Sequence, residues 1–308
     1  MNDDKTTLSI YFDEDRTYCL LMRDEDRGFA LQFIQSTDAA FSISDSYDGH
    51  GNKQGRDQIR SILSTIGERP DRITVCLPME SVFVHQFPAP LSLAGEEVRK
   101  LVRFEISQHF PDKNYEHFRS QAFPLAARLD DTRMMLAVIM DRKITESVNA
   151  LLRDFGIVDH IAVGQLAVHE AFLYNYPEHV SQTVAIIGVQ GRYLDISVLK
   201  NGQAAYLHTL HYNDEDELID GCEAEFKNIL EDYVAYLDGA YVFGSNLTVD
   251  ILSAMQARLS IPVKRFNALR MMSTTLDARA REYCGRIAHI IAPCVGCGLP
   301  RTETGILI

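Results

Sequence analysis

The segment 184–210 has the outline of a phosphate-binding hairpin. An apolar run ends at Gly188, a turn follows through Gly191, and the next run reaches Asn201-Gly202, a pair typical of a tight β-hairpin. Backbone N–H groups at glycines can approach phosphate oxygens, and a nearby carboxylate would hold a magnesium ion. No carboxylate stands between the start of the apolar run and Gly191. The sequence therefore predicts the hairpin more firmly than it predicts phosphate chemistry.

Two cysteines near the C-terminus, Cys294 and Cys297, have the spacing of a redox pair or of half a zinc site. His289 precedes them, but no second Cys/His pair occurs at a matching spacing, so at most three ligands are available. Small buried residues in a close-packed, glycine-rich turn explain the same pattern. We favour this packing interpretation, and the redox and metal interpretations stay open.

Other polar residues that could do chemistry are isolated in the sequence. His208 and His211 flank a strand end, and Asp159 and Asp195 are candidate carboxylates. The chain has no Gly-x-Ser-x-Gly elbow, no His-Glu-x-x-His motif and no glycine-rich Walker loop. The sequence therefore predicts no catalytic residue and no metal ligand.

Composition excludes several functional classes. The chain has 308 residues, of which 46% are hydrophobic, enough for about two domains with their own cores. Its net charge of −13 argues against nucleic acid as a partner. No apolar run approaches the length of a membrane span, and the polar first residues do not resemble a secretory signal, so we expect a cytoplasmic protein without direct membrane insertion. The six scattered cysteines fit reduced core residues.

The order of apolar runs and turn signals predicts two similar α/β halves. In each half a meander of strands is followed by helices, which favours a duplicated architecture. We place the first domain at 1–177, with a small α/β subdomain inserted at about 79–141, and the second at 178–308. Single helices are expected at about 215–237 and 277–291, and the C-terminal helix is expected to pack back on the first domain.

With these elements in order, the chain resembles the actin-like ATPase superfamily. Within it, the resemblance is to the PilM-type component of type IV pilus assembly and to the cytoplasmic domain of type II secretion L proteins. It covers nearly the whole chain as an order of elements. Short local matches carry it: 73–78, 84–88, 96–98, 104–111, 152–157, 163–171, 184–188, 242–245 and 295–299.

The resemblance implies a duplicated actin-like, ribonuclease H-like fold in which two hairpins, each usually with an aspartate and a glycine, wrap nucleotide phosphates. The first turn, 12–16, has carboxylates but no glycine. In the second, Ile186 stands where the family places its aspartate, and isoleucine cannot bind magnesium. The family's adenosine-side Gly-Gly turn is only half matched. We therefore predict a degenerate nucleotide cleft with no bound cofactor; its candidate residues are Gly188, Gly191, Gly244 and Ser245.

The resemblance implies a non-enzymatic scaffold or assembly protein that works through protein partners, a membrane-anchored assembly component among them. In the family, the corresponding subunit binds a short N-terminal peptide of a membrane partner, which would hold this chain at the inner membrane. The alternative is an active ATPase or phosphotransferase that uses ATP and magnesium with Asp13, Asp15 and Asp195 as an altered acidic set. A third hypothesis is a cofactor-free binding module unrelated to pili. The sequence leaves the oligomeric state undetermined.

Overall fold

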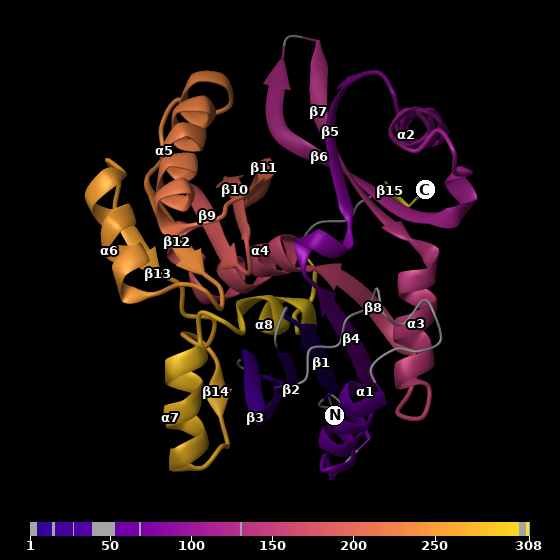
Figure 1. Ribbon diagram of the computed structural model, residues 1–308, viewed down its shortest axis with the longest axis vertical. Coiled ribbons are helices and arrows are strands. Elements are labelled where there is room, and N and C mark those ends of the chain that lie inside the picture. Colours follow the sequence, from indigo (N-terminus) through magenta and orange to yellow (C-terminus); the bar gives the residue numbers. More distant parts are fainter. Residues whose placement is uncertain are drawn as a thin grey trace.

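The computed structural model describes residues 5–13, 16–26, 28–38, 53–67, 69–129, 131–301 and 306–307. Its first sheet has the strand order β14-β3-β2-β1-β4-β8 (Figure 1). Strands β1 to β3 form an antiparallel meander, and β4 and β8 continue the sheet in parallel with β1. The strands are β1 (Thr6–Phe12), β2 (Thr17–Glu25), β3 (Gly28–Thr37), β4 (Arg72–Leu77), β8 (Val158–Val163) and β14 (Ser273–Thr274).

The second sheet repeats this topology, with the order β11-β10-β9-β12-β13. Again a three-stranded antiparallel meander is extended by parallel strands. Asn201 and Gly202 both have positive φ, as the predicted tight hairpin between β10 and β11 requires. The strands are β9 (Thr183–Gln190), β10 (Tyr193–Lys200), β11 (Gln203–His211), β12 (Gly239–Phe243) and β13 (Val263–Arg265). The repeated topology confirms the predicted duplication.

Helices cover both faces of each sheet because the inner strands are apolar on both sides. Helices α1 (Lys53–Ser64) and α3 (Arg142–Leu152) pack on the outer face of the first sheet. Helices α5 (Glu215–Asp232) and α6 (Val249–Arg258) pack on the second. Between the sheets lie α4 (Gly164–Asn175) and α8 (Ala292–Gly298), at the centre of Figure 1, within one large apolar core.

A third sheet has the order β15-β6-β7-β5; its strands β5 to β7 are inserted between β4 and α3, and β15 joins it from residues 306–307. Its strands are β5 (Phe83–Pro90), β6 (Phe118–Leu129), β7 (Thr132–Asp141) and β15 (Ile306–Leu307). Helix α2 (Glu96–His109) packs on it through Val98, Val102 and Ile106. The described ranges also contain the short 3-10 helices η2 (Met79–Ser81), η3 (Tyr115–His117) and η4 (Pro177–His179). The domain limits at 177 and 79–141 stay a prediction.

Two helices differ from the predicted ranges. The helix predicted at 277–291 ends earlier, as α7 (Ala278–Ile287), and α8 follows as a separate helix with Pro293 in its first turn, where proline is tolerated, whereas proline inside a continuous helix would break it. The helix predicted at 215–237 ends at Asp232, and Val234 and Leu237 enter the core from the connection that follows.

Helix α8 lies very close to α4 and also contacts β1 and β4. A Cβ atom on Gly296 would lie 1.7 Å from the carbonyl oxygen of Ala167, so only glycine allows this approach.

None of the helices in the described ranges is both long and apolar enough to cross a bilayer.

Candidate functional site: a closed cleft and an open cavity

The end of the first hairpin and the turn of the second meet at a very small cavity. Its volume is about 10 Å³, and it is lined by Asp13, Pro78, Met79, Glu80, Gln190, Gly191, Tyr193 and Asp195. Pockets for small molecules typically measure about 300–1,000 Å³. A volume of this size holds roughly one water molecule. The predicted nucleotide position is therefore closed in this structure.

Side chains fill the space beneath Gly188. A Cβ atom on Gly188 would lie 2.8 Å from Cζ of Phe243, which is fully buried. Ile186, in place of the expected aspartate, is also fully buried. The amide of Gln165 lies across this strand: its Nε2 donates to the carbonyl of Ile186 at 2.8 Å and to Oγ of Ser197 at 2.7 Å.

Asn246 connects the turn that contains Gly191 with the turn that contains Gly244 and Ser245, the other residues predicted for the nucleotide cleft. Its Oδ1 accepts a hydrogen bond from the backbone N–H of Gly191 at 3.2 Å, and its Nδ2 donates to the Gly191 carbonyl at 3.1 Å. Gly244 has φ +121°, and a Cβ atom there would lie 2.1 Å from the carbonyl oxygen of Val189. The hydroxyl of Ser245 donates to Oδ1 of Asn246 at 3.1 Å. Within the described residues these two turns therefore contact each other directly.

The structure brings together part of the acidic set that was predicted for the alternative activity. Asp13 and Asp195 line the small cavity with Glu80, whereas Asp15 lies outside the described residues. The net pKa of Asp195 is raised to about 7: burial raises it most, the Thr209 hydroxyl, which donates at 2.6 Å, acts in the opposite direction, and the nearby Glu80 adds a smaller upward shift. Tyr11 donates to Oδ1 of Asp13 at 3.2 Å. Because the carboxylates surround about 10 Å³ of space, the residues present do not fit ATP with its magnesium ion.

The cysteines of the C-terminal motif are packed in the core. All six cysteines are free and buried, and Cys294 and Cys297 lie in α8. Oγ of Ser9 in β1 donates to the Cys294 carbonyl at 2.6 Å. These contacts agree with the packing interpretation of the motif, because they hold α8 against the first sheet.

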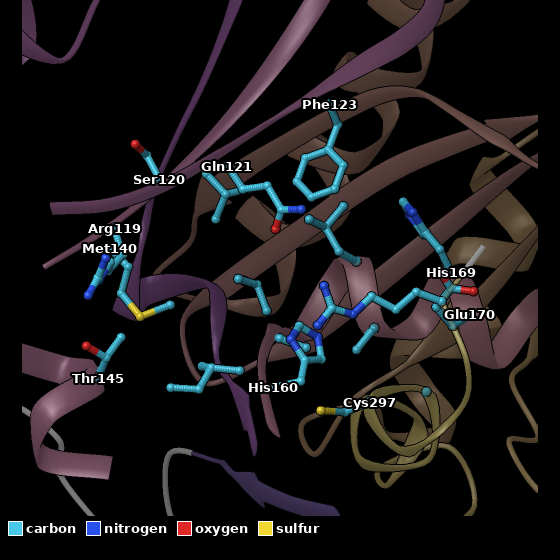
Figure 2. A pocket seen from close by; sticks show the side chains of 18 of the residues that line it. Arg119, Ser120, Gln121, Phe123, Met140, Thr145, His160, His169, Glu170 and Cys297 are labelled. Atoms are coloured by element: carbon cyan, nitrogen blue, oxygen red, sulfur yellow. The ribbon is translucent and has the colours of Figure 1, made fainter. Parts of the chain in front are cut away.

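A much larger cavity, of about 510 Å³, lies between the inserted sheet and the first sheet. It is lined from β6, β7, α3, β8, α4 and α8. Figure 2 shows Gln121 and Phe123 from β6 on one side, with His160 from β8 and Cys297 from α8 on the other. No local motif in the sequence marks this cavity, because its residues come from six separated elements.

The lining combines apolar and charged groups. Phe123, Met140 and Leu166 supply apolar surface, and the charged residues Arg119, Asp159, Glu170 and Arg301 also line the cavity. Burial and, to a smaller extent, the positive charge of Arg301 lower the pKa of His160 to about 3, so His160 is neutral at physiological pH. Apolar surface with a few polar groups is typical of a binding pocket.

The edge of the first sheet runs along this cavity. Strand β8 is the last in its sheet, and among the described residues no strand pairs with its outer edge. All of its residues from Asp159 to Val163 line the cavity. An extended peptide can bind such an edge through main-chain hydrogen bonds while its side chains occupy adjacent pockets.

Comparison with known proteins agrees with this architecture. A chain of the structure described as "PilM-PilN type IV pilus biogenesis complex" has a TM-score of 0.77, is 12% identical, and is matched over 95% of this chain and 97% of that chain. A Bacteroides thetaiotaomicron VPI-5482 protein with actin-like ATPase fold and unknown function has a TM-score of 0.52 at 12% identity, over 86% of this chain and 94% of that chain. No protein-family model matches the chain, and no curated protein matches it in sequence.

These likenesses establish the fold class: the chain has the actin-like ATPase fold. Among solved structures it is similar, over nearly its whole length, to a chain of the PilM-PilN complex. The fold that the resemblance implied is therefore confirmed.

Proposed function

We propose that the protein is a non-enzymatic platform component of a type IV pilus or related secretion apparatus, and that its cavity beside β8 binds an extended segment of a protein partner. The contrast between the two cavities carries the proposal: about 510 Å³ is open beside β8, and about 10 Å³ remains at the nucleotide position. In this role the two turns at the nucleotide position stabilise the fold by packing against each other, and ATP hydrolysis is lost.

The likeness to the PilM-PilN complex supports the choice of partner. A PilN-type membrane-anchored protein would supply the segment, and the chain would reach the inner membrane only through it. The outer edge of β8, which no strand pairs within the described ranges, would offer main-chain hydrogen bonds to such a segment, and Phe123 and Leu166 would offer apolar contacts for its side chains. Arg119 and Asp159 would select its charge pattern.

The test is a titration of the full chain with a synthetic peptide of the N-terminal residues of the PilN-type protein from the same organism. Gln121 is half-buried and lines the cavity, so Gln121→Trp fills it. Gln203→Trp, at an exposed position of β11, is the matched control. We expect saturable calorimetric binding by the wild type and by Gln203→Trp, and loss of binding in Gln121→Trp. Equal binding by both variants would contradict the proposal.

A second candidate function, magnesium-dependent ATP hydrolysis, is favoured by one observation. Asp13, Glu80 and Asp195 line a single cavity between the hairpins, where the related fold places phosphates and metal. This activity would require Gly191 and Asn246 to separate. Saturable binding of Mg-ATP, with turnover that is lost in Asp13→Asn, would replace the scaffold proposal; the absence of binding would exclude this alternative.

A further inference from the structure

Two histidines and a glutamate converge on the inserted sheet, away from both cavities. His85 lies on the edge strand β5, and Glu105 and His109 lie one turn apart on α2. Their ligand atoms all lie within 4.8 Å of one another; this is the one such cluster of at least three His, Cys, Asp or Glu residues in the described ranges. Nε2 of His85 is 3.0 Å from Oε2 of Glu105 and 3.4 Å from Nε2 of His109.

These separations match the coordination of a small divalent metal ion. Zinc binds imidazole nitrogen at about 2.0–2.1 Å in tetrahedral sites, which places two such nitrogens about 3.3 Å apart. The measured Nε2–Nε2 distance of 3.4 Å and the Nε2–Oε2 distance of 3.0 Å are close to that value. The ligand atoms of Glu105 and His109 lie within 4.8 Å of each other, so a shift of the exposed His109 side chain would let one ion contact all three atoms.

Packing holds the three side chains in place. The ring of His85 stacks between Phe83 and Phe87, with centroids 6.2 and 5.8 Å away. The centroid of the His109 ring lies 4.9 Å from that of Phe83 and 4.3 Å from that of His85, which it approaches edge-on. Helix α2 itself is fixed to the sheet by buried residues at helical spacing, including Val102 and Ile106. Ligands that are positioned before the metal arrives lose less conformational entropy on binding.

We infer that His85, Glu105 and His109 form a binding site for a divalent transition metal ion of the zinc class. Two imidazoles and one carboxylate favour zinc, cobalt or nickel over magnesium or calcium, which prefer oxygen ligands. Three protein ligands leave a fourth position for water or for a side chain of a bound protein. His109 is exposed, so this position is open to solvent. The ion would fasten α2 to the edge strand β5.

The test uses the full chain, freed of metal with a chelator and titrated with cobalt(II). Tetrahedral cobalt absorbs visible light strongly, and zinc should displace it. We expect about one ion per chain in the wild type. The absorption should be absent in His85→Gln and in His109→Ala. His117→Ala, which removes an exposed histidine of η3 in the same inserted region, is the matched control and should bind as the wild type does.

A thermal-unfolding measurement separates ligand loss from misfolding. Without metal, each variant should still unfold in one cooperative transition, which shows that it folds, although loss of the His85 or His109 ring contacts should lower its midpoint temperature. Added zinc should raise that temperature for the wild type and His117→Ala only, because binding to the folded state stabilises it. A wild type that takes up no cobalt, or a His109→Ala variant that binds cobalt as the wild type does, would overturn the proposal. This site is independent of the peptide cavity, so either proposal can fail alone.

Discussion

The region beneath Gly188 and the cavity beside β8 both contact the helix α4, yet the first is filled by side chains and the second is open. Gln165 of α4 donates to β9 and β10 on the closed side, whereas its neighbour Leu166 lines the open cavity. His169 touches both sides, since its Nε2 lies 2.7 Å from Oγ of Ser197 and it also lines the cavity. One actin-like fold therefore contains a very small cavity between the hairpins and a large cavity beside β8.

The two regions differ in what borders them. On the closed side, β9 is flanked by β10 and β12, and Phe243 fills the space beneath Gly188. On the open side, β8 ends its sheet, and the inserted sheet stands beside it without pairing among the described residues. Substitutions in the closed region should therefore affect stability strongly, and substitutions that line the open cavity should act mainly on binding.

The largest expected effect comes from forcing the closed region apart at Gly244. In Gly244→Ala the new methyl group would lie 2.1 Å from the Val189 carbonyl oxygen, at a φ of +121° that alanine rarely adopts. We expect a loss of about 3–5 kcal/mol in the free energy of unfolding, measured with urea. In Gly285→Ala, where a Cβ atom meets nothing within 4 Å, the change should stay below about 1 kcal/mol. Equal effects would show that the turns are not in tight contact.

A smaller effect should follow from the buried carboxyl of Asp195. Its pKa in the folded state is raised by burial to about 7, above its value in the unfolded chain. Its protonated form therefore contributes stability that is complete below pH of about 4 and is lost as the pH rises through about 7. Asp195→Asn keeps an oxygen that accepts from Thr209 and removes this dependence. The free energy of unfolding of the variant, compared with that of the wild type, should therefore be about 2–3 kcal/mol higher at pH 8 than at pH 5.

Urea unfolding at the two pH values checks this prediction. Asp112→Asn, at an exposed turn position, is the control and should follow the wild type. If Asp195→Asn shows the same pH dependence as the wild type, the carboxyl is not buried in the closed region, and the contrast between the two cavities is weakened.

The smallest effect is expected at Asn246, which joins the closed turns from an exposed position. Asn246→Ala removes both of its hydrogen bonds to Gly191 and should cost about 1 kcal/mol. Ser245→Ala removes only a hydroxyl that donates to Asn246, and should cost less. Urea unfolding measures the cost, and amide exchange at Gly191 reports whether the turns separate. Unchanged exchange in Asn246→Ala would mean that other contacts close the cleft.

The fold could be predicted from local sequence signals, whereas the site could not. Apolar runs that end in glycine, such as the one before Gly188, and the Asn201-Gly202 hairpin indicate strand order directly. The sequence also marks Ile186 as a residue that cannot bind magnesium. It does not reveal that Asn246 bridges two turns or that Phe243 fills the space beneath Gly188, because these contacts join separate elements. The open cavity depends on how the inserted sheet stands against β8, which no local pattern encodes.

Hydrogen–deuterium exchange on the full chain compares the two regions in one measurement. The chain is labelled alone, with the PilN-type peptide, and with Mg-ATP. If the cavity beside β8 binds the peptide and the region between the hairpins binds no nucleotide, the peptide should slow exchange in β8 and β6. Mg-ATP should leave exchange unchanged at 188–195 and 244–246. Protection of those two turns by Mg-ATP, with no protection of β8 by the peptide, would contradict it.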